Sequence, residues 1–242
     1  MSNSKAVMRI FFTITFLAIF SSLSAQTLSG SQLLSKAIAY HDPNGNWAEF
    51  SGDLRITLQS KDKPDRVSNL SINLVEEYFQ HSSQSDGNTI VQAVKKDSCS
   101  FMLNGSSVIS DADMKKHRMS CNRANLWKNY YTYLYGLPMK LKDPGTHIDP
   151  VTERREFKGK EYLVLRATFD ASVGTDVWYF YFDPQTYAME VYQFFKQEAK
   201  NDGEYILLSG IETISGVKMP KTRKWYYNNQ DGYLGTDVLS KP

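Results

Sequence analysis

Every second residue is apolar in several segments of this chain. The alternation is clear in residues 54–58 and 70–74, and residues 89–93 continue it with a higher apolar content. Because successive side chains of a strand point to opposite faces of a sheet, this pattern predicts strands that bury one face. Polar stretches at residues 61–65 and 82–88 have the composition of turns. We therefore predict an antiparallel meander in this half of the chain.

The same alternation returns after residue 145 and continues almost to the C-terminus. Short segments with turn chemistry, at residues 183–186, 201–203 and 215–216, separate the apolar runs as they do in antiparallel hairpins. The pattern therefore predicts a continuous antiparallel sheet, with strands at residues 162–169, 176–182, 188–195, 205–212 and 221–227.

Two segments have a helical period instead. Residues 31–40 place apolar side chains on one side of a short amphipathic helix, and residues 110–135 form a second helix that a Gly-Leu-Pro sequence ends. The fold class predicted is α+β, with helices covering one antiparallel sheet. Aromatic side chains gather on one side of the second helix. That helix either forms a lid over an apolar cavity or packs on the sheet in the ordinary way, and the candidate lid residues are Trp127, Tyr130 and Tyr131.

The strand predicted at residues 176–182 is apolar on both faces. Trp178, Phe180 and Phe182 share one face, and the residues between them, which include two tyrosines, share the other. An antiparallel sheet commonly leaves one face in water, so this strand is either covered on both faces or lines a cavity on one. Tyrosine and tryptophan suit cavity walls, because each combines a large apolar body with a polar tip.

The N-terminal residues have the pattern of a secretory signal peptide. Lys5 and Arg9 precede an apolar run at residues 10–20, and small residues up to Ala25 follow it. The run is shorter than the roughly 20 residues that a membrane anchor needs. We expect cleavage after Ala25 and a single domain over residues 26–242, exported to the periplasm or outer surface of a Gram-negative bacterium. No cysteine near the cleavage point offers a site for lipid attachment.

Charge gives no sign of a polyanionic partner. Without Lys5 and Arg9 the 28 basic residues fall to 26, which equals the number of acidic residues. Nucleic acid is therefore not an expected partner. Cys99 and Cys121 are the only cysteines. In an oxidising compartment they form a disulfide, or they remain two buried and unlinked thiols, and their spacing does not decide between these alternatives.

The sequence has none of the common catalytic or phosphate-binding motifs that we considered. It lacks a Gly-x-Ser-x-Gly elbow, a His-Glu-x-x-His helix, a Cys-x-x-Cys pair and a glycine-rich phosphate loop. The spacing of the four histidines is not that of metal ligands, and they are His41, His81, His117 and His147. We predict no cofactor, no metal and no enzymatic activity, although a convergent polar pocket around His41 would revive the enzyme hypothesis.

Three segments of the C-terminal half, GKEYLVLRATFD, VWYFYFDPQTYAMEVYQFF and GVKMPKTRKWYY, resemble the LolA/LolB superfamily of lipoprotein carriers. Together with His41, Gly45 and Trp47 after the first helix, they are also similar to DUF6503, a family of exported proteins from Bacteroidetes-type bacteria. The resemblance implies a strongly curved, unclosed antiparallel barrel that helices cap, with an apolar cavity for the acyl chains of lipids or lipoproteins.

The leading hypothesis is therefore a protein that binds a lipid or acylated protein in a cavity. The expected wall consists of Leu163, Leu165, Phe169, Trp178, Phe180 and Phe182, and a slip of one residue would exchange each strand residue for its neighbour. The alternative is a structural or interaction module of the envelope with the same fold, a filled core and no small ligand.

Overall fold

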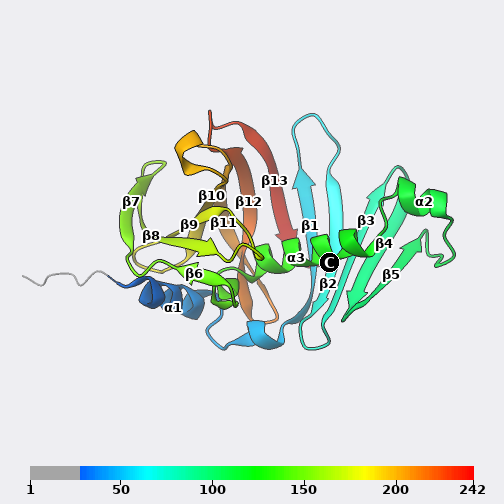
Figure 1. Ribbon diagram of the computed structural model, residues 1–242, viewed down its shortest axis with the longest axis horizontal. Helices are drawn as coiled ribbons and strands as arrows, with labels where there is room; N and C mark the ends of the chain where they lie inside the picture. Colours follow the sequence, from blue (N-terminus) through cyan, green and yellow to red (C-terminus); the bar gives the residue numbers. More distant parts are fainter. Residues whose placement is uncertain (1–27) are drawn as a thin grey trace, which may run out of the picture.

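A computed structural model describes residues 28–242, which form one antiparallel sheet with α1 and α3 lying across it (Figure 1). The predicted signal peptide lies outside the described residues. Twelve of the 13 strands in the described chain follow the order β5-β4-β3-β2-β1-β13-β12-β11-β10-β9-β8-β6, and the remaining strand, β7, pairs with β8. The first half of the sheet contains β1 (Ser51–Gln59), β2 (Arg66–Asn73), β3 (Tyr78–Ser85), β4 (Asn88–Lys95) and β5 (Ser98–Leu103).

The second half of the sheet contains β6 (Thr146–Ile148), β7 (Glu153–Phe157), β8 (Lys160–Phe169), β9 (Val177–Phe182), β10 (Met189–Phe195), β11 (Glu204–Ile214), β12 (Val217–Tyr227) and β13 (Tyr233–Ser240). The α-helices are α1 (Gly30–His41), α2 (Asp111–Lys116) and α3 (Cys121–Gly136). Short 3-10 helices are η1 (Asn46–Glu49), η2 (Met139–Lys142) and η3 (Glu198–Lys200).

The last strand joins the two halves of the sheet. Asp237 of β13 lies opposite Leu58 of β1 on one side and opposite Arg223 of β12 on the other. The pairing path ends at β5 and at β6, and within the described residues these ends do not pair with each other. The predicted α+β class, with a curved and unclosed antiparallel sheet covered by helices, is confirmed (Figure 1).

Strand β9 is covered by protein on both faces. Phe180 and Phe182, each with no exposed surface, pack in the large core that also contains side chains of α1 and α3. Tyr181 is 1% exposed on the opposite face and belongs to a second, smaller cluster. Phe157, at the end of β7, lies over this cluster with its ring centroid 5.1 Å from that of Tyr181 and 5.3 Å from that of Tyr205. The two-sided apolar pattern therefore marks a strand between two cores.

The single helix predicted at residues 110–135 is instead two helices, α2 and α3. Arg118 has a φ of +53°, outside the helical region, and interrupts the chain between them. Ser120 then starts the second helix, because its hydroxyl accepts a hydrogen bond from the main-chain N–H of Arg123 at 3.2 Å. The break separates a short exposed helix from the longer one that packs on the sheet.

The turn predicted at residues 82–88 is shorter than expected. Strand β3 continues to Ser85, and only Asp86 and Gly87, with φ of 51° and 74°, form the turn. Polar side chains lie on both faces of β3, so its sequence does not alternate between apolar and polar residues. Its hydrogen bonding to β2 and β4 makes it a strand. Strands β5, β6, β7 and β13 were also not predicted.

The two cysteines form a disulfide that joins strand β5 to the start of α3. The Cα atoms of Cys99 and Cys121 are 5.6 Å apart, within the usual range for a disulfide. Of the two alternatives that the sequence left open, the structure therefore has the bonded pair. The bond attaches α3 to the strand at one end of the sheet.

Candidate functional site

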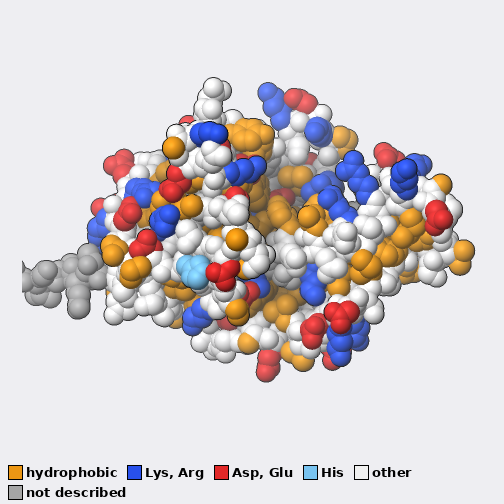
Figure 2. All heavy atoms as spheres, viewed as in Figure 1, with side chains coloured by type: hydrophobic (Ala, Val, Ile, Leu, Met, Phe, Trp, Pro, Cys, Tyr) orange, Lys and Arg blue, Asp and Glu red, His pale blue; other side chains and the backbone are white. Residues whose placement is uncertain are grey.

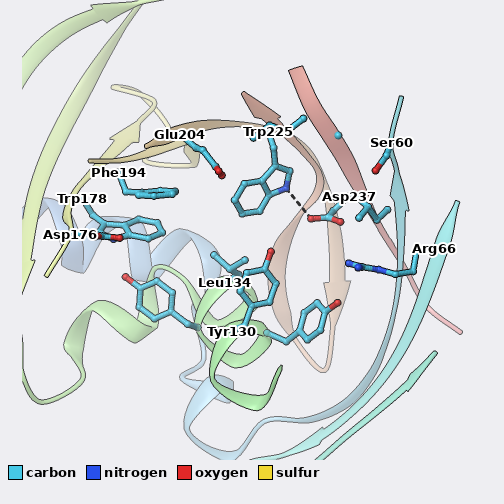
Figure 3. Close-up of a pocket in the computed structure, with 15 residues that line it drawn as sticks. Ser60, Arg66, Tyr130, Leu134, Asp176, Trp178, Phe194, Glu204, Trp225 and Asp237 are labelled. Carbon is cyan, nitrogen blue, oxygen red and sulfur yellow. Dashed lines mark hydrogen bonds between the residues drawn. The ribbon is translucent and has the colours of Figure 1, made fainter. Parts of the chain in front are cut away.

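A pocket of about 440 Å³ lies between α3 and the sheet (Figure 3). In space filling, this face of the molecule is hollowed above α3, between the second half of the sheet and the β1–β2 hairpin (Figure 2). Helix α3 supplies Tyr130, Tyr131, Tyr133 and Leu134. The other lining residues come from the sheet and its connections, and they are Leu58, Ser60, Arg66, Asp176, Trp178, Phe194, Glu204, Trp225, Leu234, Gly235 and Asp237.

Strand register explains why these sheet residues meet. Trp178 of β9 lies opposite Phe194 of β10, and Phe194 lies opposite Glu204 of β11. Directly opposed residues of antiparallel strands place their side chains on the same face. The rings of Trp178 and Phe194 accordingly stack, with centroids 4.9 Å apart. The row forms one aromatic wall of the pocket, with a carboxylate at its end.

A second pocket of about 570 Å³ adjoins the first and shares Tyr130, Tyr133, Asp176 and Trp178 with it. Two of these shared residues, Tyr133 and Trp178, make an edge-to-face contact with their ring centroids 5.7 Å apart. The hydroxyl oxygen of Tyr133 is buried and has no hydrogen-bond partner. Two aromatic side chains therefore lie at the boundary between two adjoining hollows.

Acidic groups outnumber basic groups in the lining of the first pocket. Asp176, Glu204 and Asp237 face a single arginine, Arg66. Burial raises the pKa of Glu204, and it also raises the pKa of Asp237 although the indole N–H of Trp225 donates to that carboxylate at 2.9 Å. None of these carboxylates forms an ion pair with another residue of the described chain. The walls are thus aromatic and the polar groups mainly acidic.

A buried arginine lies beside this pocket. Arg223 is 1% exposed, and its guanidinium donates hydrogen bonds to the main-chain carbonyls of Pro220 at 2.8 Å and Leu134 at 3.4 Å. It also lies against the ring of Tyr135. Since Leu134 and Tyr135 belong to α3, Arg223 attaches the C-terminal turn of that helix to β12.

The structure distributes the residues of the predicted wall between pocket and core. Trp178 lines both pockets and Phe169 lines the second one. The other residues of that wall lie in the packed core and line neither pocket, and they are Leu163, Leu165, Phe180 and Phe182. The strand face that was predicted to point inward does point toward the helices, but side chains from the helices fill most of the space over it.

Two of the three candidate lid residues line the first pocket. Tyr130 is 39% exposed at its edge and Tyr131 is 3% exposed. Trp127 does not line it, and its ring packs on Tyr131 and on His81, with centroids 5.5 Å and 5.2 Å apart. The second helix therefore lines the hollow with residues between Tyr130 and Leu134, and its role as a lid stays a prediction.

Sequence reasoning missed several residues of the pocket and its surroundings. Phe194 and Trp225 lay in predicted strands, and their aromatic character was the available signal. Glu204 and Asp237 carried no signal, because isolated acids near strand ends usually lie in water. Arg223 occupies an inward position of a predicted strand, where a charged residue departs from the pattern.

The His41-Gly45-Trp47 element has an architectural role. The main-chain N–H of Met189 donates to Nε2 of His41 at 2.9 Å, so Nδ1 carries the proton and donates to the carbonyl of Lys218 at 2.7 Å. Trp47 packs so closely on Gly136 that a Cβ there would lie 2.2 Å from the indole. The element ties the end of α1 to β10 and β12, and it supports the end of α3.

The histidines do not meet in one site. His81 is buried beneath α3, with Nε2 3.0 Å from the hydroxyl oxygen of Ser68, whereas His147 lies on the surface beside Asp170. Among residues 28–242 there is no group of three or more His, Cys, Asp or Glu side chains with the geometry to hold a metal ion. In the same range, no helix has the length and apolar character to cross a membrane.

The fold is similar to solved structures of bacterial proteins. One is a LolA-superfamily protein from Nitrosomonas europaea, with a TM-score of 0.50 and 12% identity, covering 88% of this chain and 92% of that one. Another is a DUF1329 family protein from Desulfovibrio piger, with a TM-score of 0.49 and 10% identity, covering 88% of this chain and 92% of that one. At such identities the likeness to the Nitrosomonas protein shows the fold alone.

Sequence comparison identifies the family. No curated protein matches the chain. The model of DUF6503, a family of unknown function, matches residues 8–241. The predicted resemblance to this family and to the LolA superfamily is confirmed. The chain therefore belongs to the DUF6503 family and has a LolA-like fold.

Proposed function

We propose that this chain is a non-enzymatic protein of the cell envelope that holds the acyl chain of a lipid, or of an acylated protein, in the pocket between α3 and the sheet. The pocket itself carries the proposal. Its volume of about 440 Å³ is within the roughly 300–1,000 Å³ of common ligand sites, and aromatic side chains form most of its walls. Apolar walls favour an apolar guest, because contact with the guest removes both surfaces from water.

The proposal extends to the whole mature chain. Residues 1–25 act as a cleaved export signal, and residues 26–242 act as one domain in the periplasm or on the outer surface. The similarity of the fold to that of a LolA-superfamily protein supports an envelope role. An acylated envelope protein is the partner class that fits this arrangement.

A matched pair of variants tests the proposal. Phe194 lines the pocket, whereas Phe195, the next residue of β10, packs in the cluster on the opposite face. We expect native mass spectrometry of the purified wild-type protein to detect bound lipid. We also expect Phe194→Ala to weaken binding of a fluorescent fatty acid about tenfold, as loss of a buried aromatic contact implies, with Phe195→Ala unchanged in binding. Equal effects of the two substitutions, or no bound lipid and no probe binding by the wild type, would contradict a pocket-bound guest.

The second candidate is a structural or interaction module without a small ligand. One observation favours it, namely that both faces of β9 are covered by side chains of the protein. A wild-type protein that carries no lipid and binds no fatty acid, but that retains envelope protein partners in cross-linking, would support this candidate instead.

A further inference from the structure

We infer that the guest of the first pocket is an amphiphile whose polar end carries a positively charged nitrogen, held between the aromatic walls and the carboxylates of Asp176, Glu204 and Asp237. This inference rests on the proposed function and specifies the ligand class of the same site. The charges of the lining residues, the aromatic walls and an unpartnered polar atom support it.

The charges of the pocket lining favour a cationic guest. The lining contains Asp176, Glu204 and Asp237 but a single basic side chain, Arg66, which is exposed on the β2 side. Figure 3 shows the carboxylate of Glu204 pointing into the pocket between Phe194 and Trp225. These carboxylates are half-buried and form no ion pair within the described chain, so a cation that enters the pocket offsets part of their desolvation cost. A ligand with an anionic head group would add to the repulsion.

The aromatic lining of the pocket also favours a cation. Trp178, Phe194 and Trp225 present rings to the hollow from the sheet, and Tyr130 and Tyr133 present rings from α3. A cation over an aromatic face is attracted by the negative face of the ring, and cages of such rings recognise quaternary ammonium groups. Aromatic walls next to carboxylates therefore suit an alkylammonium better than either feature does alone.

A polar atom without a hydrogen-bond partner lies at the boundary of the two pockets. Tyr133 lines both pockets, and its hydroxyl oxygen is buried without a hydrogen-bond partner in the described chain. A buried hydroxyl with no partner costs free energy. The N–H groups of a primary amine head group can donate to this oxygen, so the unpartnered atom points independently to a guest with a donor at this position.

Three probes with the same dodecyl chain test the inference below their micelle concentrations. They are dodecylammonium, dodecyl sulfate and dodecyl maltoside, and calorimetry follows the binding of each. We expect the ammonium probe to bind about tenfold more tightly than the maltoside, a difference that one desolvated cation contact can supply. We expect the sulfate to bind most weakly.

Glu204→Gln supplies the matched variant, with Glu212→Gln on the same strand as its control. Glu212 lies outside both pockets and pairs with Lys241 at 3.7 Å. Glu204→Gln should weaken the ammonium probe several-fold and leave the maltoside unchanged, while Glu212→Gln changes neither. Thermal unfolding checks that both variants fold, and the wild-type probe series decides the question even if one does not.

The outcomes separate the inference from the proposed function. Equal binding of all three probes, or tighter binding of the sulfate, overturns the ammonium preference and leaves an acyl-binding pocket in place. Failure of all three probes, with no lipid in native mass spectra, overturns both. A preference for ammonium that Glu204→Gln does not reduce overturns the assigned role of that carboxylate.

Discussion

The guanidinium of Arg223 lies 3.9 Å from the ring centroid of Tyr135, and the two side chains are 1% and 2% exposed. The contact joins β12 to α3 beside the candidate pocket. No carboxylate within ion-pair distance neutralises this arginine in the described chain, so its partners are the aromatic ring and the two main-chain carbonyls. Arg223 therefore adds directional contacts to the apolar packing of α3 on the sheet.

Arg223→Ala should lower the free energy of unfolding by about 3 kcal/mol, because it leaves a cavity and two carbonyls without their donor. Arg223→Lys should cost less, since lysine keeps the charge but loses the planar stacking. Urea unfolding measures both effects. Hydrogen exchange should also accelerate in the last turns of α3 in each variant. Wild-type exchange there would refute the attachment of the helix through Arg223.

Tyr133→Ala should connect the two adjoining pockets. The side chain lines both, and its removal takes away the ring that packs on Trp178. We expect the variant to gain affinity for longer alkyl chains relative to shorter ones, measured by displacement with a series of fatty acids. Tyr133→Phe is the control, because it keeps the ring. It should raise stability by about 1 kcal/mol by removing a buried hydroxyl without a partner. An unchanged chain-length preference in Tyr133→Ala would mean that the hollows stay separate.

Stability should fall with acidification between pH 6.5 and pH 4. Burial lowers the pKa of His41 to about 4, and the positive charges of Lys218 and Arg223 act in the same direction. Burial likewise lowers the pKa of His81 to about 4, with Arg66 and Arg123 contributing. The unfolded chain, with a histidine pKa near 6.5, binds protons that the folded chain excludes. The contribution of the two neutral histidines to the free energy of unfolding is complete above pH 6.5, declines toward pH 4 and changes little below pH 4.

Each of these histidines can contribute on the order of 3 kcal/mol over that interval. Urea unfolding at half-unit pH steps measures the slope. His81→Phe keeps the ring that packs on Trp127 and Tyr131 but cannot be protonated, so the slope should become shallower. A slope equal to that of the wild type would show that His81 is not protonated on unfolding in this interval.

Reduction of the disulfide between Cys99 and Cys121 should destabilise the protein by about 3 kcal/mol, because the bond closes a loop with a sequence separation of 22 residues. Unfolding in urea with and without reductant measures the difference, and the Cys99→Ser and Cys121→Ser double variant gives the same comparison without reductant. Hydrogen exchange should increase at β5 and at the first turn of α3. Identical midpoints under both conditions would contradict a stabilising bond.

The sequence alone determined the class of fold and much of the sheet. Strands β1, β2, β4 and β8 to β12 were predicted at or near their positions, because alternation is a local property that pairing partners do not change. Helix α1 was predicted for the same reason, from its own period. Strand β3 was not predicted, because the residues from Ser82 to Ser85 are all polar and carry no period.

Tertiary structure decided where the hollow lies. Periodicity assigned Phe180 and Phe182 to the same face as Trp178, which is correct, but it does not show which parts of that face the helices fill. The insertion of β13 between β1 and β12 brings Asp237 into the pocket from a strand far along the chain. These contacts join residues distant in sequence, and a pattern that extends over a few residues contains no information about them. The local alternation therefore specifies the strands, and long-range packing specifies the pocket.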